Sequence, residues 1–408
     1  MTRVMLYFQL HQPHRLSDYR IFDIGSGKDY FDDGMNSLIA NKVSSNCYIP
    51  VSNMLLKLLE EIPTFSFAMS ISGVLIEQLR EYNDEAYNAI SQLASHDRVE
   101  LLSETYYHSL SSLFDAKEFK FQVNKHRDMI KSLFNKSPVV FRNTELLHSN
   151  SISSLAKELG FKGIIAEGCH GTIGDRSPYH VYETNDHLPL IPKASKLSDD
   201  IAFRFSNKDW AHWPLTPQKY YSWLKTISES GDTINICFDY ETLGEHHPKQ
   251  SGIMDFMAQV IRLVSNDNNI GFVTPTMLIE NVAPIGISDA PDITSWADKE
   301  RDESAWLGNE LQITAANTLY SLKDNVLATN NDKIMELWRK LQTSDHYYYM
   351  STKNMLDGSV HKYFSPYESP YDAFMRYMNV MEDFRTMLLR HNMSSNEKTD
   401  NLSLKSID

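Results

Sequence analysis

Carboxyl and imidazole groups follow several short apolar runs of the chain, at the point where each run ends. His11 follows "VMLYFQL", Glu145 follows "VVFRN" and Asp239 follows "INICF". In barrels and in open α/β sheets the carboxyl ends of parallel strands meet at one rim, and enzymes build their sites there. If these runs are parallel strands, the three side chains converge and offer acid–base or nucleophilic chemistry.

Glu145 and Asp239 form a candidate catalytic pair. Glycoside hydrolysis needs one ionised carboxylate to attack the anomeric carbon and one protonated carboxyl to protonate the leaving oxygen. Arg142 precedes Glu145 by three residues, and a nearby cation would keep Glu145 ionised. Asp239 follows an apolar strand, so burial would raise its pKa, as an acid requires. The alternative is that both carboxylates cap a helix or form salt bridges.

His11 and His14 are three residues apart and flank Pro13. As a metal site they would supply two ligands to zinc or iron. The sequence has no His-Glu-x-x-His and no His-x-x-x-His, and Pro13 disfavours a regular helix that presents both rings on one face. We interpret His11 as a hydrogen-bonding residue that contacts a substrate hydroxyl, and His14 as structural.

Eight short runs must position these residues. Most of them are near-continuous apolar segments, which is typical of parallel strands buried on both faces. Helical patterns lie between them at 51–62, 116–134, 150–160 and 216–231, so the order predicts βα units in a barrel or a doubly wound sheet. The predicted strands are "VMLYFQL", "TFSFAMS", "VELLS", "VVFRN", "KGIIA", "IAFRF", "INICF" and "IGFVT".

The pattern changes after residue 284. Residues 306–390 contain helical patterns and no convincing strand, and the last residues are polar. We therefore expect an α/β domain over 1–284, a helical domain over 285–392 and a polar tail over 393–408. The stretch 168–200 has no clear periodicity, and loops of that length are usually functional.

Composition excludes several classes of function. The 408 residues include 39 Lys and Arg and 53 Asp and Glu, a formal charge of −14, which disfavours a nucleic-acid partner. No apolar run approaches the ~20 residues that a membrane helix needs, so no membrane partner is expected. Three cysteines cannot form a disulfide framework, and they predict a reducing, cytoplasmic location.

Five blocks, in chain order, resemble those of glycoside hydrolase family 57, the retaining enzymes of α-glucan metabolism, and most closely its α-amylase-like members. The resemblance as a whole spans about residues 4 to 393. The blocks are "LHQP" at 10–13, "SGVLIEQL" at 72–79, "FRNTELLH" at 141–148, "FDYETLGEHH" at 238–247 and "SWADKERDESAWLGNELQ" at 295–312.

The resemblance implies a distorted (β/α)7 barrel followed by a helical bundle that completes the active-site cleft, with no metal and no other cofactor. It maps the nucleophile to Glu145 and the acid/base to Asp239, whose carboxyls should lie about 5–5.5 Å apart. Eight predicted strands exceed seven, and "IAFRF" and "IGFVT" are the candidates for a place outside the barrel. The residues predicted to bind substrate are His11, Glu77, Tyr240, Glu241, His246, Trp296 and Asp298.

Several activities stay open. The expected substrate is an α-1,4-glucan, and hydrolysis, 4-α-glucan transfer and branching share these blocks. Gln9 stands where the first block of some relatives has a second histidine, which affects the choice of donor or acceptor. From other classes, a metal-dependent polysaccharide deacetylase lacks the required Asp and His spacing, and a non-catalytic glucan-binding protein would not need both carboxylates. Oligomeric state is not predicted.

Overall fold

The computed structural model describes residues 2–353 and 365–404. The chain forms two compact units. The first comprises Met1–Gln12, Ser37–His108 and Asp115–Glu303. The second comprises Pro13–Asn36, Ser109–Phe114 and Ser304–Asp408.

Seven parallel strands of the first unit form a ring, each beside the next. These strands are β1 (Thr2–Leu10), β2 (Phe67–Ile71), β3 (Val99–Leu101), β4 (Val140–Arg142), β5 (Gly163–Glu167), β7 (Pro189–Lys193) and β8 (Thr233–Asp239). Parallel pairing joins neighbouring strands in the order β8, β1, β2, β3. A second set of parallel pairs joins β4, β5 and β7 in that order. A parallel bridge between Ser103 and Phe141 joins β3 to β4. The Ala194 amide donates to Asn235 O at 2.7 Å, which links β7 to β8 and completes the distorted (β/α)7 barrel.

The two faces of each strand pack in different places, because side chains alternate along a strand. In β1, Leu6 and Phe8 belong to a large core that includes residues of the surrounding helices, such as Leu55 of α2 (Ile49–Glu61). Met5 and Tyr7, in contrast, pack with Ile191 and Cys237 of other ring strands. The second group fills the interior of the barrel.

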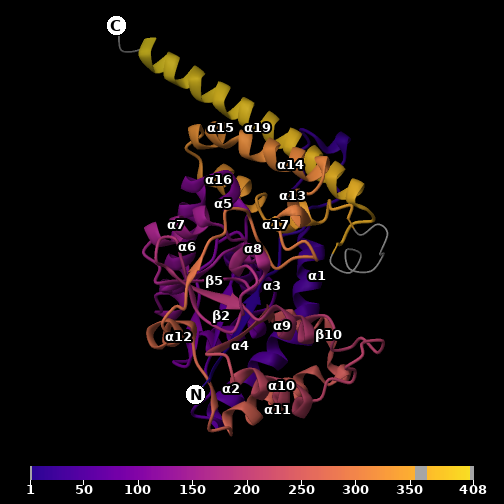
Figure 1. Ribbon diagram of the computed structural model, residues 1–408. Helices are drawn as coiled ribbons and strands as arrows, with labels where there is room; N and C mark the ends of the chain where they lie inside the picture. The colour runs from indigo at the N-terminus through magenta and orange to yellow at the C-terminus, as the bar shows by residue number, and fades with distance from the viewer. Residues whose placement is uncertain (1, 354–364, 405–408) are drawn as a thin grey trace. The chain divides into compact units, whose positions relative to one another are not determined.

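Helices cover the outside of the ring, and four predicted helices are confirmed with small changes of boundary. Their caps explain the boundaries: the Asp115 carboxylate accepts from Glu118 N at 2.8 Å, and Thr216 caps α10 before Pro217. Figure 1 shows α10 and α11 side by side. The helices are α2 (Ile49–Glu61), α3 (Gly73–Tyr82), α4 (Asp84–Ser95), α6 (Ala116–Phe134), α7 (Asn150–Glu158), α8 (His170–Ile173), α9 (Ser195–Ala202), α10 (Pro217–Ser228), α11 (Ile253–Ser265) and α12 (Pro275–Asn281).

One predicted strand is wrong, and one ring strand was missed. The run "IAFRF" is wrong as a strand, because its first residues end helix α9 and the rest form turns. The true ring strand is β7, "PLIPK", inside the stretch without clear periodicity; its prolines, which lack an N–H donor, hide it from a strand pattern. "IGFVT" contributes β11 (Ile270–Phe272), which pairs only with the first residues of β1.

Short strands at the edges add to the barrel. β6 (Tyr182–Thr184) runs antiparallel to β7, and β12 (Ile287–Ser288) pairs with β6. β9 (Leu243–Gly244) pairs with β10 (His247–Pro248). Since β12 and the segment as far as Glu303 belong to the first unit, the compact unit ends later than the expected boundary at residue 284.

The described part of the second unit is helical. Tyr377 of the last helix donates to Leu341 O at 2.8 Å, and Trp338 Nε1 donates to Leu319 O at 2.9 Å. The last helix, α19, appears as one long yellow ribbon in Figure 1, and it runs to Leu404 through most of the polar stretch expected as a tail. Helix α1 (Asp33–Val43) begins in the second unit and ends in the first. The other helices described for the second unit are α5 (Ser111–Phe114), α13 (Ser304–Leu307), α14 (Glu310–Ser321), α15 (Lys323–Ala328), α16 (Asp332–Lys340), α17 (Ser344–Tyr348) and α19 (Pro370–Leu404).

Within the described residues, no helix has both the length and the apolar character needed to span a bilayer.

Candidate active site

A layer of polar side chains caps the apolar interior of the barrel. Each ring strand, or the residues directly after it, ends its row of side chains inside the barrel with a polar residue. That residue lies two positions after an apolar residue of the barrel interior, as Asp239 does after Cys237. All but Asp239 are buried, and Asp239 is partly exposed. In ring order from β1 the polar residues are Gln9, Ser70, Glu104, Arg142, Glu167, Lys193 and Asp239.

Glu145 lies in the turn η3 (Thr144–Leu146) directly after β4. Its backbone is left-handed, with φ of 54°, a conformation that costs a non-glycine residue about 1 kcal/mol and is frequent at functional sites. The carboxylate accepts two hydrogen bonds, from His108 Nε2 to Oε1 at 3.0 Å and from Trp296 Nε1 to Oε2 at 2.6 Å. The Glu145 side chain remains 19% exposed, so a substrate can still reach it.

His108 is a buried imidazole held between two carboxylates. Its Nδ1 lies 3.0 Å from Glu104 Oε2, and its Nε2 faces Glu145. Burial disfavours the charged ring, but the hydrogen bonds to Glu104 and Glu145 prevail and raise the pKa of His108 to about 9. Burial likewise opposes the charge of Glu104, but His108 and Arg142 hold its pKa at about 2. At neutral pH His108 is therefore an imidazolium that donates from both nitrogens.

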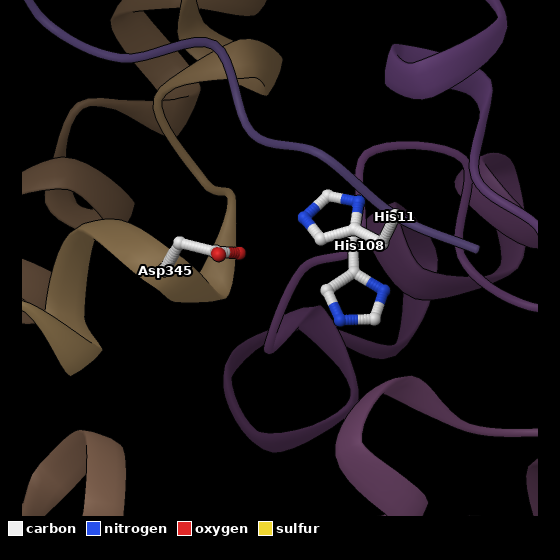
Figure 2. A group of neighbouring side chains, drawn as sticks. All are labelled: His11, His108 and Asp345. Atoms are coloured by element: carbon white, nitrogen blue, oxygen red, sulfur yellow. The ribbon is translucent and has the colours of Figure 1, made fainter. Parts of the chain in front are cut away.

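Two first-block residues contact His108. The ring of His11 stacks on the ring of His108 with centroids 3.9 Å apart, and His11 Nδ1 is 2.8 Å from Ser72 Oγ. Figure 2 shows these two imidazoles next to each other; the third side chain in that view, Asp345, belongs to α17 of the second unit. The side-chain amide of Gln9 lies 3.2 Å from His108 Nε2. One imidazole thus separates Gln9 from the candidate nucleophile.

Asp239 ends β8 and has the environment of an acid. Burial and the nearby charge of Glu145 raise its pKa to about 7, against the opposing charges of Arg142 and His108. The expected direction is confirmed. Glu241, two residues later, accepts from Tyr48 Oη at 2.5 Å and from His11 N at 3.4 Å. Burial and Asp239 raise the pKa of Glu241 to about 8.

Trp296 joins the cluster through its polar edge. Besides the indole hydrogen bond, its backbone N donates to Glu145 O at 3.3 Å. The guanidinium carbon of Arg142 lies 4.9 Å from the centre of the indole, and Lys193 Nζ lies 5.2 Å from it. Trp296 also belongs to the first unit, together with the barrel. Stacking of a sugar on this ring stays a prediction.

Two of the predicted binding residues, Tyr240 and Glu77, have described partners other than the two candidate catalytic carboxyls. Tyr240 is fully buried, its ring edge-on to Phe8 and its hydroxyl 2.9 Å from Ser52 Oγ, so it is a core residue. Glu77 accepts from Tyr106 Oη at 2.8 Å and lines a surface pocket between α3 and α6.

His246 and Asp298 are half-buried. Burial lowers the pKa of His246 to about 4, so its ring is neutral. Asp298 has a left-handed backbone, with φ of 53°. Contact of His246 or Asp298 with substrate stays a prediction.

Sequence reasoning missed the role of His108. The sequence pointed to Arg142 as a cation near Glu145, and this stays a prediction. Among the described ion pairs, Arg142 lies 3.6 Å from Glu104, and His108 contacts Glu145. The spacing of Glu104 and His108 by four residues after β3 was visible in the sequence, but it showed no link to Glu145. Lys193 was also missed, because the proline-containing strand that it ends was not recognised in the sequence.

Stability should depend on pH through His108. Its folded pKa of about 9 exceeds the unfolded value of about 6.5, so its contribution is complete below pH 6.5 and is lost as pH rises through 9. In urea unfolding, His108→Gln should therefore lose more stability relative to the parent at pH 6 than at pH 9.5. His187→Gln, which removes an exposed pair with Glu183, should cost little at either pH. A His108→Gln deficit that is the same at both pH values would contradict the assignment.

The sequence matches the family model of glycosyl hydrolase family 57 over residues 5–291. A relative from Methanocaldococcus jannaschii, named "Putative alpha-amylase", is 40% identical over 390 residues, which cover 92% of this chain and 83% of that protein.

Solved structures share the fold. A GH57-type branching enzyme from Pyrococcus horikoshii superposes with a TM-score of 0.65 at 15% identity, over 89% of this chain and 87% of that one. A 4-alpha-glucanotransferase from Thermococcus litoralis gives a TM-score of 0.61 at 15% identity, over 85% of this chain but 56% of that one. The match to the family model over more than half of the residues and the 40% identical relative show that the chain belongs to glycosyl hydrolase family 57.

Proposed function

We propose that the protein is a retaining glycoside hydrolase of α-1,4-glucans, with Glu145 as nucleophile and Asp239 as general acid/base. The observation that carries the proposal is the contrast between the two carboxyls. Glu145 accepts hydrogen bonds from an imidazolium and an indole, which favour its ionised form. Asp239 has a pKa raised to about 7 by burial and by Glu145 itself. Such a pair separates the role of nucleophile from that of acid.

In the first step an oxygen of Glu145 attacks the anomeric carbon. The bond from that carbon to the glycosidic oxygen breaks, and Asp239 transfers its proton to the departing oxygen. A covalent glycosyl ester of Glu145 results, and Asp239 is left as a carboxylate. Each Glu145 oxygen has a second lone pair, so the hydrogen bonds from His108 and Trp296 do not block attack.

In the second step Asp239 removes a proton from the acceptor, whose oxygen attacks the same carbon and releases Glu145. With water as acceptor the reaction is hydrolysis. With a sugar hydroxyl it is transfer or branching, the activities named for the two similar structures described above. Residues around Gln9, which contacts His108, stay candidates for selecting the acceptor.

The rival readings find less support. A metal site on His108 would need a free ring lone pair, but both of its nitrogens face carboxylates and its pKa is raised. A non-catalytic glucan-binding protein would not explain why two carboxyls with opposite protonation meet at the rim of the barrel. The partner is therefore proposed to be an α-glucan. A reducing, cytoplasmic location agrees with three free thiols.

Replacement of the nucleophile tests the central assignment. Glu145→Gln removes the attacking charge but keeps the size and hydrogen-bonding shape, so turnover of maltooligosaccharides should fall by at least about 10³-fold while the fold is kept. The matched control is Glu100→Gln, a largely buried strand carboxylate that binds Thr276 N at 2.9 Å, away from the polar layer. Substantial hydrolysis by folded Glu145→Gln would refute the assignment.

The pH dependence of the reaction tests Asp239. The acid must hold its proton, so kcat/KM should decline as pH rises through about 7, the pKa of Asp239 in the free enzyme. Because the charge of Glu145 contributes to that raised pKa, the Asp239 pKa should be lower in Glu145→Gln, as measured by ¹³C NMR of labelled carboxyls. An unchanged Asp239 pKa would show that the two groups do not interact.

The products distinguish the remaining activities. Double displacement retains configuration, so ¹H NMR of fresh products from maltopentaose should show the α anomer first. Hydrolysis raises the number of reducing ends, transfer redistributes chain lengths without raising it, and branching adds α-1,6 signals. The β anomer appearing first would indicate inversion and exclude the covalent step.

A further inference from the structure

A second group of buried charges lies beside the catalytic pair. Lys193 Nζ is 3.3 Å from Glu167 Oε2 and 3.3 Å from Asp199 Oδ1. Arg301 Nη2 is 2.6 Å from Asp199 Oδ2, and its Nη1 is 3.8 Å from Glu167 Oε1. Ser195 donates to Glu167. Two cations and two carboxylates thus form a closed network across β5, β7, α9 and the segment after β12.

The network contacts Trp296 in two ways. The ammonium of Lys193 faces the indole at 5.2 Å from the ring centre, a cation–π distance. Arg301 donates from Nη1 to the backbone oxygen of Trp296, and its own backbone oxygen accepts from Ser295 N at 3.0 Å. One contact therefore acts on the plane of the ring, and the other acts on the backbone that carries it.

Ring orientation matters because an indole has a single N–H donor with a fixed direction. The Trp296 donor meets Glu145 Oε2 at 2.6 Å, the shorter of the two hydrogen bonds described for that carboxylate. A small rotation of the ring or shift of its backbone would lengthen this bond. Arg301 has a left-handed backbone, with φ of 57°, so its segment is held in a conformation that it would not favour alone.

We propose that Lys193 and Arg301 are positioning residues that hold the indole of Trp296 against the carboxylate of Glu145, with Glu167 and Asp199 as their anchors. The proposal rests on the proposed function, in which Glu145 is the nucleophile. A purely structural network is the alternative, since buried ion pairs often add little to stability yet destabilise when broken. The two interpretations differ in one respect: only in the first does disruption of the network change the hydrogen bond from Trp296 to Glu145.

Arg301→Lys keeps the charge and loses the fork that joins Asp199 to the Trp296 backbone. Because misplaced catalytic contacts cost about 10- to 100-fold in rate, kcat/KM should fall within that range while the thermal midpoint changes little. The acid limb of kcat/KM should move up by about one pH unit, since a weaker donor stabilises the Glu145 carboxylate less. Arg204→Lys is the matched control, because Arg204 pairs with Asp200, the neighbour of Asp199, and should change neither quantity.

A double-mutant cycle tests whether the effect passes through the indole. Trp296→Phe removes the donor and should itself reproduce the loss and the shift of the acid limb. In the Trp296→Phe background, Arg301→Lys should then have no further effect. Additive losses would overturn the proposal. If Arg301→Lys does not fold, Lys193→Met permits the same cycle on the acid limb, which reports Glu145; the basic limb is left out because Lys193 also acts on Asp239.

A readout without turnover separates this proposal from the proposed function. The chain has six tryptophans, and ¹⁵N-indole spectra of labelled protein should give one assignable signal for Trp296, the one missing in Trp296→Phe. Arg301→Lys should move that signal upfield as the hydrogen bond weakens, and Arg204→Lys should not. A signal unmoved by Arg301→Lys would overturn the positioning role, whereas full activity of Glu145→Gln would overturn only the nucleophile.

Discussion

Charge pairing inside the barrel is the constraint on which the site depends. An isolated ion in a low-dielectric interior costs several kcal/mol, so buried charges must be paired. From β3 to β7 the last inward positions alternate in sign, as Glu104, Arg142, Glu167 and Lys193. Neighbouring members pair at 3.6 Å and 3.3 Å. The alternation lets four formal charges occupy one rim without an excess of either sign.

Asp239 follows Lys193 in the ring. Among the described residues it has no such ion-pair partner to itself, and Lys193 is already shared by Glu167 and Asp199. On its other side the ring supplies the neutral Gln9. Burial therefore dominates, and the pKa of Asp239 rises to about 7. The raised pKa of Asp239 thus arises from its position in the ring rather than from a special contact.

The carboxylate of Glu145 has different surroundings from that of Asp239, because Glu145 is not on a strand. The left-handed turn after β4 carries it beyond the polar layer, to a place where the imidazolium of His108 and the indole of Trp296 both donate to it. His108 is charged because Glu104 of the polar layer accepts from its other nitrogen. The ring of paired charges thus supports one carboxyl as an anion and leaves the next as an acid.

The sequence by itself determined six of the seven ring strands, four of the outer helices, the helical region beyond and both carboxyls of the proposed catalytic pair. Apolar strands, helix caps and the residues that follow each strand are local features, so they can be read along the chain. Only the tertiary structure decided that β7 is a strand despite two prolines, because pairing with β5 outweighs local preference. It also decided that the imidazole of His108 lies beside Glu145, and that Tyr240 is a core residue although it lies between Asp239 and Glu241. The distances between charged groups and the burial of each side chain depend on how the strands close into a ring. No local sequence pattern encodes that closure.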